Sequence, residues 1–231
     1  MNAPEPRPFE RLETADGSST LLHPLFKEAY SSVHGALTQA RRLYLELTRT
    51  HLHPKPRVLE IGFGLGVNLR VTLESALSRG VRLEYLGYEF APVERALLES
   101  VEVPLGEVAR GVWAQVLERW PGASRSLEPL RLLGEWGSLE IRFEDVTKAQ
   151  FPRAWATAIY LDPFSPAVNP EPWSLEVMRK LHRTARPGAW LATYSVAGSV
   201  RRNLTQAGFE VERVPGVGKK AWLRASRSRS G

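Results

Sequence analysis

Apolar residues recur with two different periods along this chain. From residue 57 onward, short apolar runs alternate with longer segments in which apolar residues return every three or four positions. Runs of the first kind predict buried strands, and segments of the second kind predict amphipathic helices. Strands and helices in alternation are typical of an α/β fold, with a mostly parallel sheet covered by helices on both faces.

The pattern predicts a sheet of seven strands. These are residues 58–61, 83–89, 138–143, 158–161, 189–194 and a closing antiparallel pair at 209–213 and 220–225. Helices are predicted at 65–78, 93–100, 107–120, 173–185 and 199–207, and residues 121–129 are predicted to form a loop. No linker separates two parts of this region, so we expect one domain over residues 57–231.

Residues 1–56 are predicted to form an N-terminal extension that packs on this domain. Residues 1–20 are rich in Pro, Glu, Ser and Thr and are expected to be a loose lead-in. A short extended segment at 19–22 and a helix at 35–49 follow, and Pro54 and Pro56 end the helix.

Composition limits the chemistry. The 231 residues are 43% hydrophobic, which suffices for one sizeable core. No apolar run approaches the ~18 residues that cross a membrane, and no signal-peptide pattern is present, so we expect a cytoplasmic protein. The chain has no cysteine, which excludes disulfides, thiolate metal sites and a thiol nucleophile. The five histidines show no ligand spacing, and we expect no metal.

The positive charge is concentrated at the C-terminal end. From Arg201 onward eight basic residues face two acidic ones, so this segment carries as much charge as the formal +6 of the whole chain. A basic end on a neutral body suggests a phosphate-bearing partner. A solvated basic tail is the alternative, and charge alone does not decide between them.

The strongest local signal is Glu60-Ile61-Gly62-Phe63-Gly64-Leu65-Gly66, which follows a predicted strand and opens a helix. Glycines allow a tight turn and the close approach of a ligand. A dinucleotide fingerprint requires Gly-x-Gly-x-x-Gly, and here the third glycine comes one residue early. With its acidic residue, the segment resembles the first motif of class I S-adenosylmethionine-dependent methyltransferases. The residues expected to bind this cofactor are Glu60, Gly62, Phe63, Gly64, Gly66 and Asn68.

Two further carboxylates follow the next strands. Glu89 ends the second strand, ~20 residues beyond the turn, where an acidic side chain accepts hydrogen bonds from a ribose diol. Asp145 follows the third strand, where class I methyltransferases place a carboxylate for the adenine amino group, and we favour it over Glu144. Each carboxylate alone can be a surface residue. Their order after the glycine turn resembles a Rossmann-like class I methyltransferase.

The fourth strand ends at Asp162-Pro163-Phe164. In open α/β sheets the carboxyl ends of the strands face the ligand crevice. The tripeptide resembles the Asp/Asn-Pro-Pro-aromatic motif of methyltransferases that act on amino groups. The resemblance implies that Asp162 is catalytic, accepts a hydrogen bond from the nucleophilic nitrogen and also contacts the cofactor. Phe164 would present its ring to positive charge. A capping Asp in a tight turn is the alternative.

A narrower resemblance begins at the same place. The stretch Asp162-Pro-Phe-Ser-Pro-Ala-Val-Asn-Pro-Glu-Pro-Trp173 is similar to the methyltransferase half of the bifunctional enzymes that make 5-methylaminomethyl-2-thiouridine at the tRNA wobble position. The similarity continues through Thr193–Arg202 and Gly216–Lys220, and covers roughly residues 15–223.

This resemblance implies N-methylation of a 5-aminomethyl group on wobble uridine, with the tRNA anticodon stem-loop as partner. The sequence stops before the family's flavin-dependent oxidase region, so we expect no oxidase activity. The substrate would then depend on other enzymes to install the 5-aminomethyl group. Phosphates would contact Arg201, Arg202, Lys219 and Lys220, while Tyr30 and Phe164 would stack on the base.

Two departures and two alternatives accompany this interpretation. The family usually carries glutamate at the position of Gln39 and glycine at that of Pro163, so we assign Gln39 no acid–base role. One alternative is a methyltransferase-fold enzyme for a small amine or a protein, including aminopropyl transfer. The basic end and Asn169-Pro170-x-x-Trp173 argue against it. The other is an idle RNA-binding module, against which the carboxylates Glu60, Glu89, Asp145 and Asp162 argue.

Overall fold

The computed structural model describes residues 8–121, 128–217 and 220–229. Its main sheet consists of β3 (Arg57–Ile61), β4 (Leu83–Tyr88), β5 (Leu130–Gly134), β6 (Gly137–Arg142), β7 (Ala156–Leu161), β8 (Ala185–Thr193), β9 (Glu210–Pro215) and β10 (Ala221–Ser226). Their order across the sheet is β5-β6-β4-β3-β7-β8-β10-β9. The five strands from β6 to β8 are parallel, whereas β5 and β10 run antiparallel to their neighbours.

The α/β fold with a mostly parallel sheet is confirmed, but the predicted strand count was one too low. The missed strand, β5, pairs with β6 through a tight turn at residues 135–136. Leu130 and Leu132 are buried on one side of β5, while Leu133 is 82% exposed. A short edge strand with an apolar residue facing solvent has weak alternation, which is why the pattern did not reveal it.

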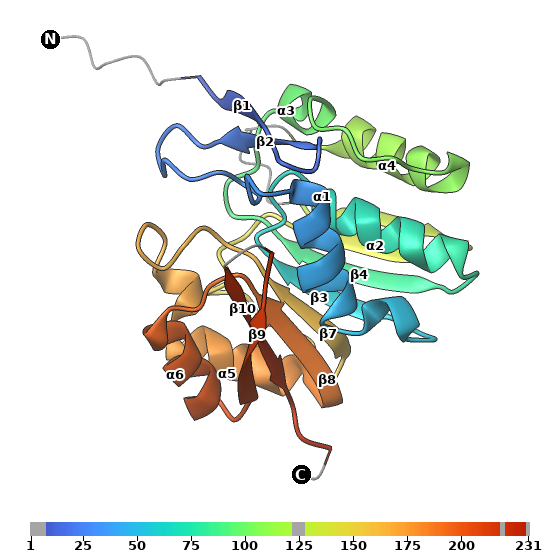
Figure 1. Cartoon of the computed structure of the whole chain (residues 1–231). Coiled ribbons are helices and arrows are strands. Elements are labelled where there is room, and N and C mark those ends of the chain that lie inside the picture. The colour runs from blue at the N-terminus through green and yellow to red at the C-terminus, as the bar shows by residue number, and fades with distance from the viewer. Residues whose placement is uncertain (1–7, 122–127, 218–219, 230–231) are drawn as a thin grey trace, which may run out of the picture.

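Helices cover both faces of the sheet. One face carries α2 (Val67–Ser78) and α4 (Glu107–Arg119), and the other carries α5 (Leu175–Thr184) and α6 (Gly198–Gln206) (Figure 1). Shorter helices are α3 (Arg95–Glu99) and the 3-10 turn η3 (Glu171–Trp173). The sheet separates two apolar clusters, because alternate residues of a strand face opposite sides. On β3, Val58 packs beneath α2, whereas Leu59 and Ile61 face α5.

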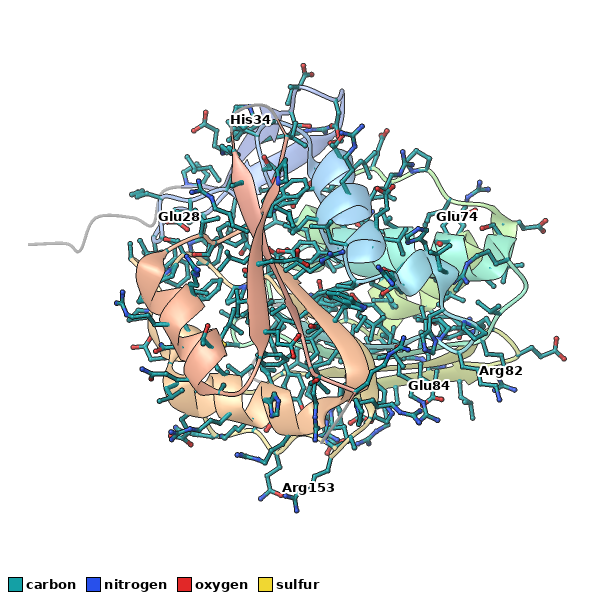
Figure 2. The ribbon with its side chains drawn as sticks, turned by 60° about the horizontal axis from the view of Figure 1, so that its bottom comes forward. Glu28, His34, Glu74, Arg82, Glu84 and Arg153 are labelled. Carbon is teal, nitrogen blue, oxygen red and sulfur yellow. The ribbon has the colours of Figure 1, made fainter. Side chains whose placement is uncertain are left out.

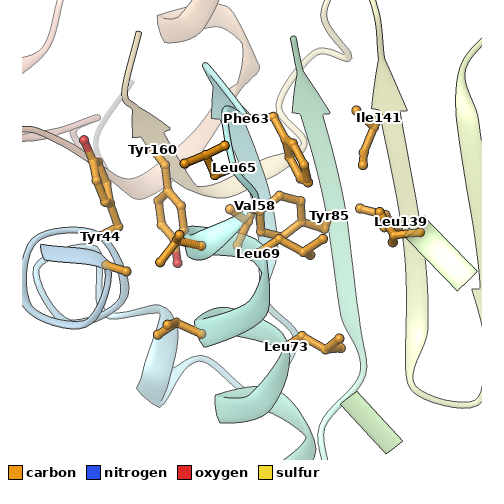
Figure 3. Packing of buried hydrophobic residues seen from close by; sticks show 14 of the residues in the cluster. Tyr44, Val58, Phe63, Leu65, Leu69, Leu73, Tyr85, Leu139, Ile141 and Tyr160 are labelled. Atoms are coloured by element: carbon orange, nitrogen blue, oxygen red, sulfur yellow. The ribbon is translucent and has the colours of Figure 1, made fainter. Parts of the chain in front are cut away.

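The N-terminal region forms its own small layer. Strands β1 (Glu10–Glu13) and β2 (Ser19–Leu22) pair antiparallel, so part of the predicted loose lead-in is a strand. The predicted single helix at 35–49 is instead a short α1 (Ala36–Thr38) followed by the π-helix η1 (Gln39–Glu46), and the 3-10 turn η2 (Thr50–Leu52) lies beyond it. Figure 3 shows Tyr44 of η1 beside Tyr160 of β7, with ring centroids 5.3 Å apart.

The basic C-terminal segment is not a free tail. Glu210–Pro215 form β9 and Ala221–Ser226 form β10 of the main sheet. Arg224 pairs with Glu212 at 2.6 Å and lies over the Trp190 ring at 4.3 Å. Arg227 donates to the carbonyls of His182 and Ala185. Part of the positive charge therefore serves the fold.

The sheet topology creates the site. From β3 the chain continues to β4 on one side, and it later returns to β7 on the other. The segments that follow the paired carboxyl ends of β3 and β7 leave to opposite faces of the sheet, which makes this a topological switch point, where open α/β sheets bind ligands. Within the described ranges, no helix is long and apolar enough to cross a membrane.

Candidate active site

A cavity of about 870 Å³ opens at this end of the sheet. This volume is in the range of small-molecule sites in proteins. Its wall combines the β3–α2 turn, the end of β4, residues 145–146, the loop after β7, the N-terminal segment 28–33 and the β9–β10 hairpin. In Figure 2 Glu28 and His34 lie at one end of the molecule, and Glu84 and Arg153 lie at the opposite end.

The glycines of the β3–α2 turn let other parts of the chain pack closely against it. Gly62, Gly64 and Gly66 have φ angles of 85°, 53° and 70°, in the left-handed region that favours glycine. A Cβ on Gly62 would lie 2.6 Å from the Asp162 carbonyl oxygen. Gly62, Phe63 and Gly64 line the cavity. Gly66 does not line the cavity. A Cβ built on Gly66 would lie 2.7 Å from the Trp113 ring, so the absence of a side chain there lets Trp113 pack against the turn.

Glu60 lies in the interior and not in the cavity wall. Its carboxylate is fully buried and accepts hydrogen bonds from Asn68 Nδ2 at 2.8 Å and Tyr85 Oη at 2.7 Å. Burial raises the pKa of Glu60 well above its ordinary value. Asn68 lines the cavity and also donates to Asp162 Oδ2 at 2.9 Å. Strand alternation turns the Glu60 side chain toward α2, and its link to the cavity runs through Asn68.

Asp162 occupies the centre of a hydrogen-bonded group. Its Oδ1 accepts from Tyr44 Oη at 2.5 Å, and its Oδ2 accepts from Asn68. Burial raises the pKa of Asp162 to about 7, although both hydrogen bonds favour the ionised form. The nearby Tyr194 lines the cavity and donates to the Pro163 carbonyl at 2.9 Å. Burial raises the pKa values of Tyr44 and Tyr194, so both remain neutral phenols at neutral pH.

The two other predicted carboxylates also reach the cavity. Glu89 accepts from the backbone N–H groups of Gly64 and Ala91, each at 2.8 Å, and burial raises its pKa. Asp145 Oδ1 accepts from the Thr147 N–H and hydroxyl, while Oδ2 accepts no hydrogen bond from the described part of the chain. Glu144 instead pairs with Arg142 at 3.8 Å and is absent from the cavity wall.

The N-terminal segment completes the wall through aromatic and acidic contacts. The Tyr30 and Phe164 rings are 5.0 Å apart, and Phe164 also packs on Phe26 at 4.6 Å. The Tyr30 ring further lies 3.0 Å from a Cβ built on Gly64. Glu28 accepts hydrogen bonds from both the N–H and the hydroxyl of Ser165. The extension thereby fixes the loop that carries Phe164.

The Asn-Pro-x-x-Trp stretch has a structural role beside this loop. Trp173 is 3% exposed and its Nε1 donates to the Phe164 carbonyl at 2.8 Å. Asn203 of α6 donates in turn to the Trp173 carbonyl at 2.9 Å. The stretch therefore braces the loop after β7 from the outside.

The predicted phosphate-binding residues separate into two places. Lys220 lies in the cavity wall, together with Arg213. Arg201 and Arg202 are exposed on α6 and lie outside that wall, and Lys219 lies outside the described residues. Sequence reasoning assigned no role to Glu28, Tyr44, Tyr194 and Arg213, which come from distant segments. Tyr194 lies within the similar stretch Thr193–Arg202, and Arg213 belongs to the basic C-terminal segment.

A metal centre is not formed in the described part of the chain, where no group of three or more His, Asp or Glu side chains is placed to hold an ion. The polar groups of the cavity fit an adenosyl-amino acid instead. The backbone of Gly62, Phe63 and Gly64 lines the cavity. The Glu89 carboxylate has lone pairs left for hydroxyl donors, and Asp145 Oδ2 accepts no hydrogen bond from the described residues.

Fold and site together define a class I methyltransferase. Residues 107–228 match the model of an S-adenosyl-L-methionine-dependent methyltransferase family, and the chain belongs to that family. S-adenosylmethionine is therefore its cofactor.

The curated relatives are more specific. The tRNA 5-methylaminomethyl-2-thiouridine biosynthesis bifunctional protein MnmC of Cupriavidus necator is 37% identical over 223 residues, which cover 92% of this chain and 33% of that protein. The protein of the same name from Caulobacter sp. is 34% identical over 218 residues, covering 85% of this chain and 35% of its own length. The chain thus spans about a third of the length of these relatives, and the resemblance seen in the sequence is confirmed.

Solved structures also superpose on this chain. The crystal structure of MnmC2 from Aquifex aeolicus superposes with a TM-score of 0.75 at 29% identity, over 99% of this chain and 72% of that chain. Spermidine synthase from Thermotoga maritima superposes with a TM-score of 0.53 at 12% identity, over 100% of this chain and 83% of that chain. The second similarity is one of fold alone.

Proposed function

We propose that this chain transfers a methyl group from S-adenosylmethionine to the nitrogen of a 5-aminomethyl group on the wobble uridine of tRNA. The product is 5-methylaminomethyluridine or its 2-thio form. The observation that carries the proposal is the 37% identity, over 92% of this chain, to a curated protein named for biosynthesis of that nucleoside. The cytoplasm, where tRNA is modified, is the proposed location, and other enzymes would install the 5-aminomethyl group.

The cofactor is proposed to bind along the carboxyl ends of β3, β4 and β6. The backbone at Gly62, Phe63 and Gly64 would pass close to it, and Asn68 and Asp162 would face its amino-acid portion. The lone pairs of Glu89 that the Gly64 and Ala91 N–H groups leave free would accept from the ribose hydroxyls. Asp145 Oδ2 would accept from the adenine amino group.

The substrate nitrogen must be neutral to react. An alkylamine resembles lysine, with a pKa of ~10.4, so it arrives mostly as the ammonium ion. A desolvated cavity lowers that pKa and releases the lone pair. The bound cofactor supplies an electrophilic methyl group. The amine nitrogen forms the new N–C bond as the S–C bond breaks, and the resulting secondary ammonium loses a proton.

Asp162 is proposed to orient the amine and to accept its proton. A carboxylate held permanently ionised would stabilise the ammonium and oppose the reaction. The pKa of about 7 avoids this, because the carboxyl exchanges its proton readily at neutral pH. Tyr44 and Asn68 fix its two oxygens, so positioning supplies much of the catalysis.

The nucleic acid is proposed to approach the cavity from the β9–β10 hairpin. Lys220 and Arg213 at the cavity, with Lys219 and the exposed Arg201 and Arg202, would contact phosphates of the anticodon stem-loop. Tyr30 and Phe164 would stack on the base. In this proposal residues 1–56 are an extension on the domain 57–231 and supply part of the site wall.

The test uses labelled S-adenosylmethionine and two tRNA pools, one carrying 5-aminomethyluridine and one unmodified. After digestion to nucleosides, label is expected as 5-methylaminomethyluridine from the first pool only. An absence of label from both pools, with cofactor binding intact by calorimetry, would overturn the tRNA assignment and leave the methyltransferase class standing.

A further inference from the structure

The end of the molecule opposite the cavity carries a group of arginines that form no ion pair with the described residues. They follow α2, flank the amino ends of β7 and β8, and follow the carboxyl end of β10. Figure 2 shows Arg153 at this end, opposite Glu28 of the cavity wall. Glu84 lies at the same end but is already paired with Arg57 at 2.9 Å. We call this group the basic pole; its members are Arg79, Arg153, Arg183, Arg186, Arg227 and Arg229.

Backbone contacts join the arginines of the basic pole into one surface. The Arg227 guanidinium donates to the carbonyl of Ala185, the first residue of β8. The N–H of Ala154, next to Arg153, donates to the Arg183 carbonyl at 2.9 Å. Within the described part of the chain, four exposed side chains of the pole have neither a hydrogen bond nor an ion pair: Arg153, Arg183, Arg186 and Arg229. Their guanidinium groups are therefore available to an anion from outside.

The charges of the basic pole act on two neighbouring histidines. Burial lowers the pKa of His53, and the charges of Arg186 and Arg79 lower it further. Burial likewise lowers the pKa of His182, and the charge of Arg227 adds to the shift. The pole thus has a positive potential.

The composition of the basic pole matches a phosphate backbone better than a protein surface. The planar guanidinium fork of arginine pairs with two oxygens of a phosphate at once. The centre of a protein–protein interface is depleted in charged residues, whereas this surface consists of them. An RNA strand carries a negative charge at every nucleotide, and unpaired arginines gain affinity by neutralising it.

Strand β10 connects the cavity with the basic pole. It begins at Ala221, which lines the cavity, and ends at Ser226, directly before Arg227. Its six residues span about 20 Å. Lys220 of the cavity wall and Arg227 of the pole therefore stand at opposite ends of one strand. An RNA with its wobble base in the cavity reaches the pole only with phosphates more than about 20 Å from that base.

We propose that the basic pole binds phosphates of the substrate tRNA beyond its anticodon stem-loop, while the wobble base occupies the cavity. This inference rests on the proposed function. In tRNA the anticodon stem continues into the rest of the molecule as a stacked helix, so one RNA that lies along β10 spans both places. Phosphate contacts position an RNA without reading its sequence. The pole therefore supplies affinity for the tRNA body, and the choice of base is left to the cavity.

The experiment measures binding of two RNAs to the whole chain over a range of salt concentrations. One is a full-length tRNA with 5-aminomethyluridine at the wobble position, and the other is its isolated anticodon stem-loop. The triple variant Arg153→Gln/Arg183→Gln/Arg186→Gln removes three exposed guanidinium groups of the pole. We expect it to bind the tRNA about 10-fold or more weakly, with a slope of log K against log salt that is smaller by about 2. Its affinity for the stem-loop should equal that of the wild type.

The matched control is Arg110→Gln/Arg119→Gln/Arg131→Gln. It removes the same charge from exposed arginines of α4 and β5, and β5 lies at the other end of the strand order from β9 and β10. We expect wild-type affinity for both RNAs. Affinity for S-adenosylmethionine, unchanged within about twofold, shows that each variant is folded.

Three results would overturn the role of the basic pole. The two triple variants could lose equal affinity for tRNA, which would show an effect of net charge alone. The pole variant could lose as much affinity for the stem-loop as for the tRNA. The wild type could bind two tRNA molecules per chain, which would place a separate RNA on the pole. Absence of methyl transfer to the tRNA, with the expected binding pattern intact, would instead overturn the proposed function and leave the RNA-binding surface standing.

Discussion

The phenol hydroxyl of Tyr44 lies 2.5 Å from Oδ1 of Asp162, although 118 positions separate the two residues in the chain. The contact joins the N-terminal extension to the loop after β7, where the nucleophile is expected. Asn68 holds the other carboxylate oxygen at 2.9 Å. A carboxyl whose two oxygens are both held, and whose pKa is about 7, is oriented and still able to exchange a proton at neutral pH.

Tyr44→Phe is expected to slow methyl transfer about 10-fold and to shift the pH dependence of the rate to higher pH. Losing the phenol donor destabilises the ionised carboxyl, so the pKa of Asp162 rises further. Single-turnover rates across pH measure both effects. Tyr160→Phe is the matched control, because it removes the hydroxyl of a buried tyrosine that bonds to Thr72 and packs against the Tyr44 ring. An identical pH profile in wild type and Tyr44→Phe would refute this role.

Gly64→Ala is expected to weaken binding of S-adenosylmethionine about 10-fold or more. The residue has φ of 53°, and a Cβ there would lie 3.0 Å from the Tyr30 ring in the cavity. Gly80→Ala is the control, since Gly80 has φ of 64° and nothing within 4 Å of a built Cβ. It should lower the free energy of unfolding by about 1–2 kcal/mol and leave calorimetric affinity unchanged. Equal affinities for the two variants would contradict the proposed cofactor path.

Asp145→Asn is expected to reduce cofactor affinity about 10-fold, whereas Glu144→Gln should not. Oδ1 of Asp145 accepts from two donors of Thr147, so the new amide must place its NH₂ at the position of Oδ2. That NH₂ would face the adenine amino group, donor against donor. Calorimetric titration with S-adenosylmethionine measures the difference. A larger effect of Glu144→Gln would reverse the assignment.

The parts of this site that follow strand ends were predictable, and the parts that depend on long-range packing were not. Glu89, Asp145 and Asp162 were predicted to reach the cavity because a parallel sheet brings its carboxyl ends together. Tyr44 was missed because its partner is 118 residues away and the π-helix that aims it has no sequence pattern of its own. Glu60 matched a motif, yet its side chain points into the core.

Stability should depend on pH through Asp162. The native carboxyl, with a pKa of about 7, keeps a proton that the unfolded carboxyl loses near its ordinary value of 3.8. Its stabilising contribution is therefore full below about pH 4 and is lost as the pH rises through about 7. Compared with Asp162→Asn, the wild type should lose up to about 4 kcal/mol of unfolding free energy over that window. Denaturant titrations at several pH values measure this, and a constant difference would show that the carboxyl is not perturbed.

The most direct test of the account is the ratio of single-turnover methyl-transfer rates of wild type and Asp162→Asn as a function of pH, with 5-aminomethyluridine RNA and saturating cofactor. With subsaturating RNA, the ionisation of the free substrate amine is common to both proteins and cancels in the ratio. We expect the ratio to rise with pH until about 7 and then to stay constant at about 100 or more. A ratio near one, or one that does not change with pH, would contradict the claim that the buried carboxyl of Asp162 takes part in the reaction.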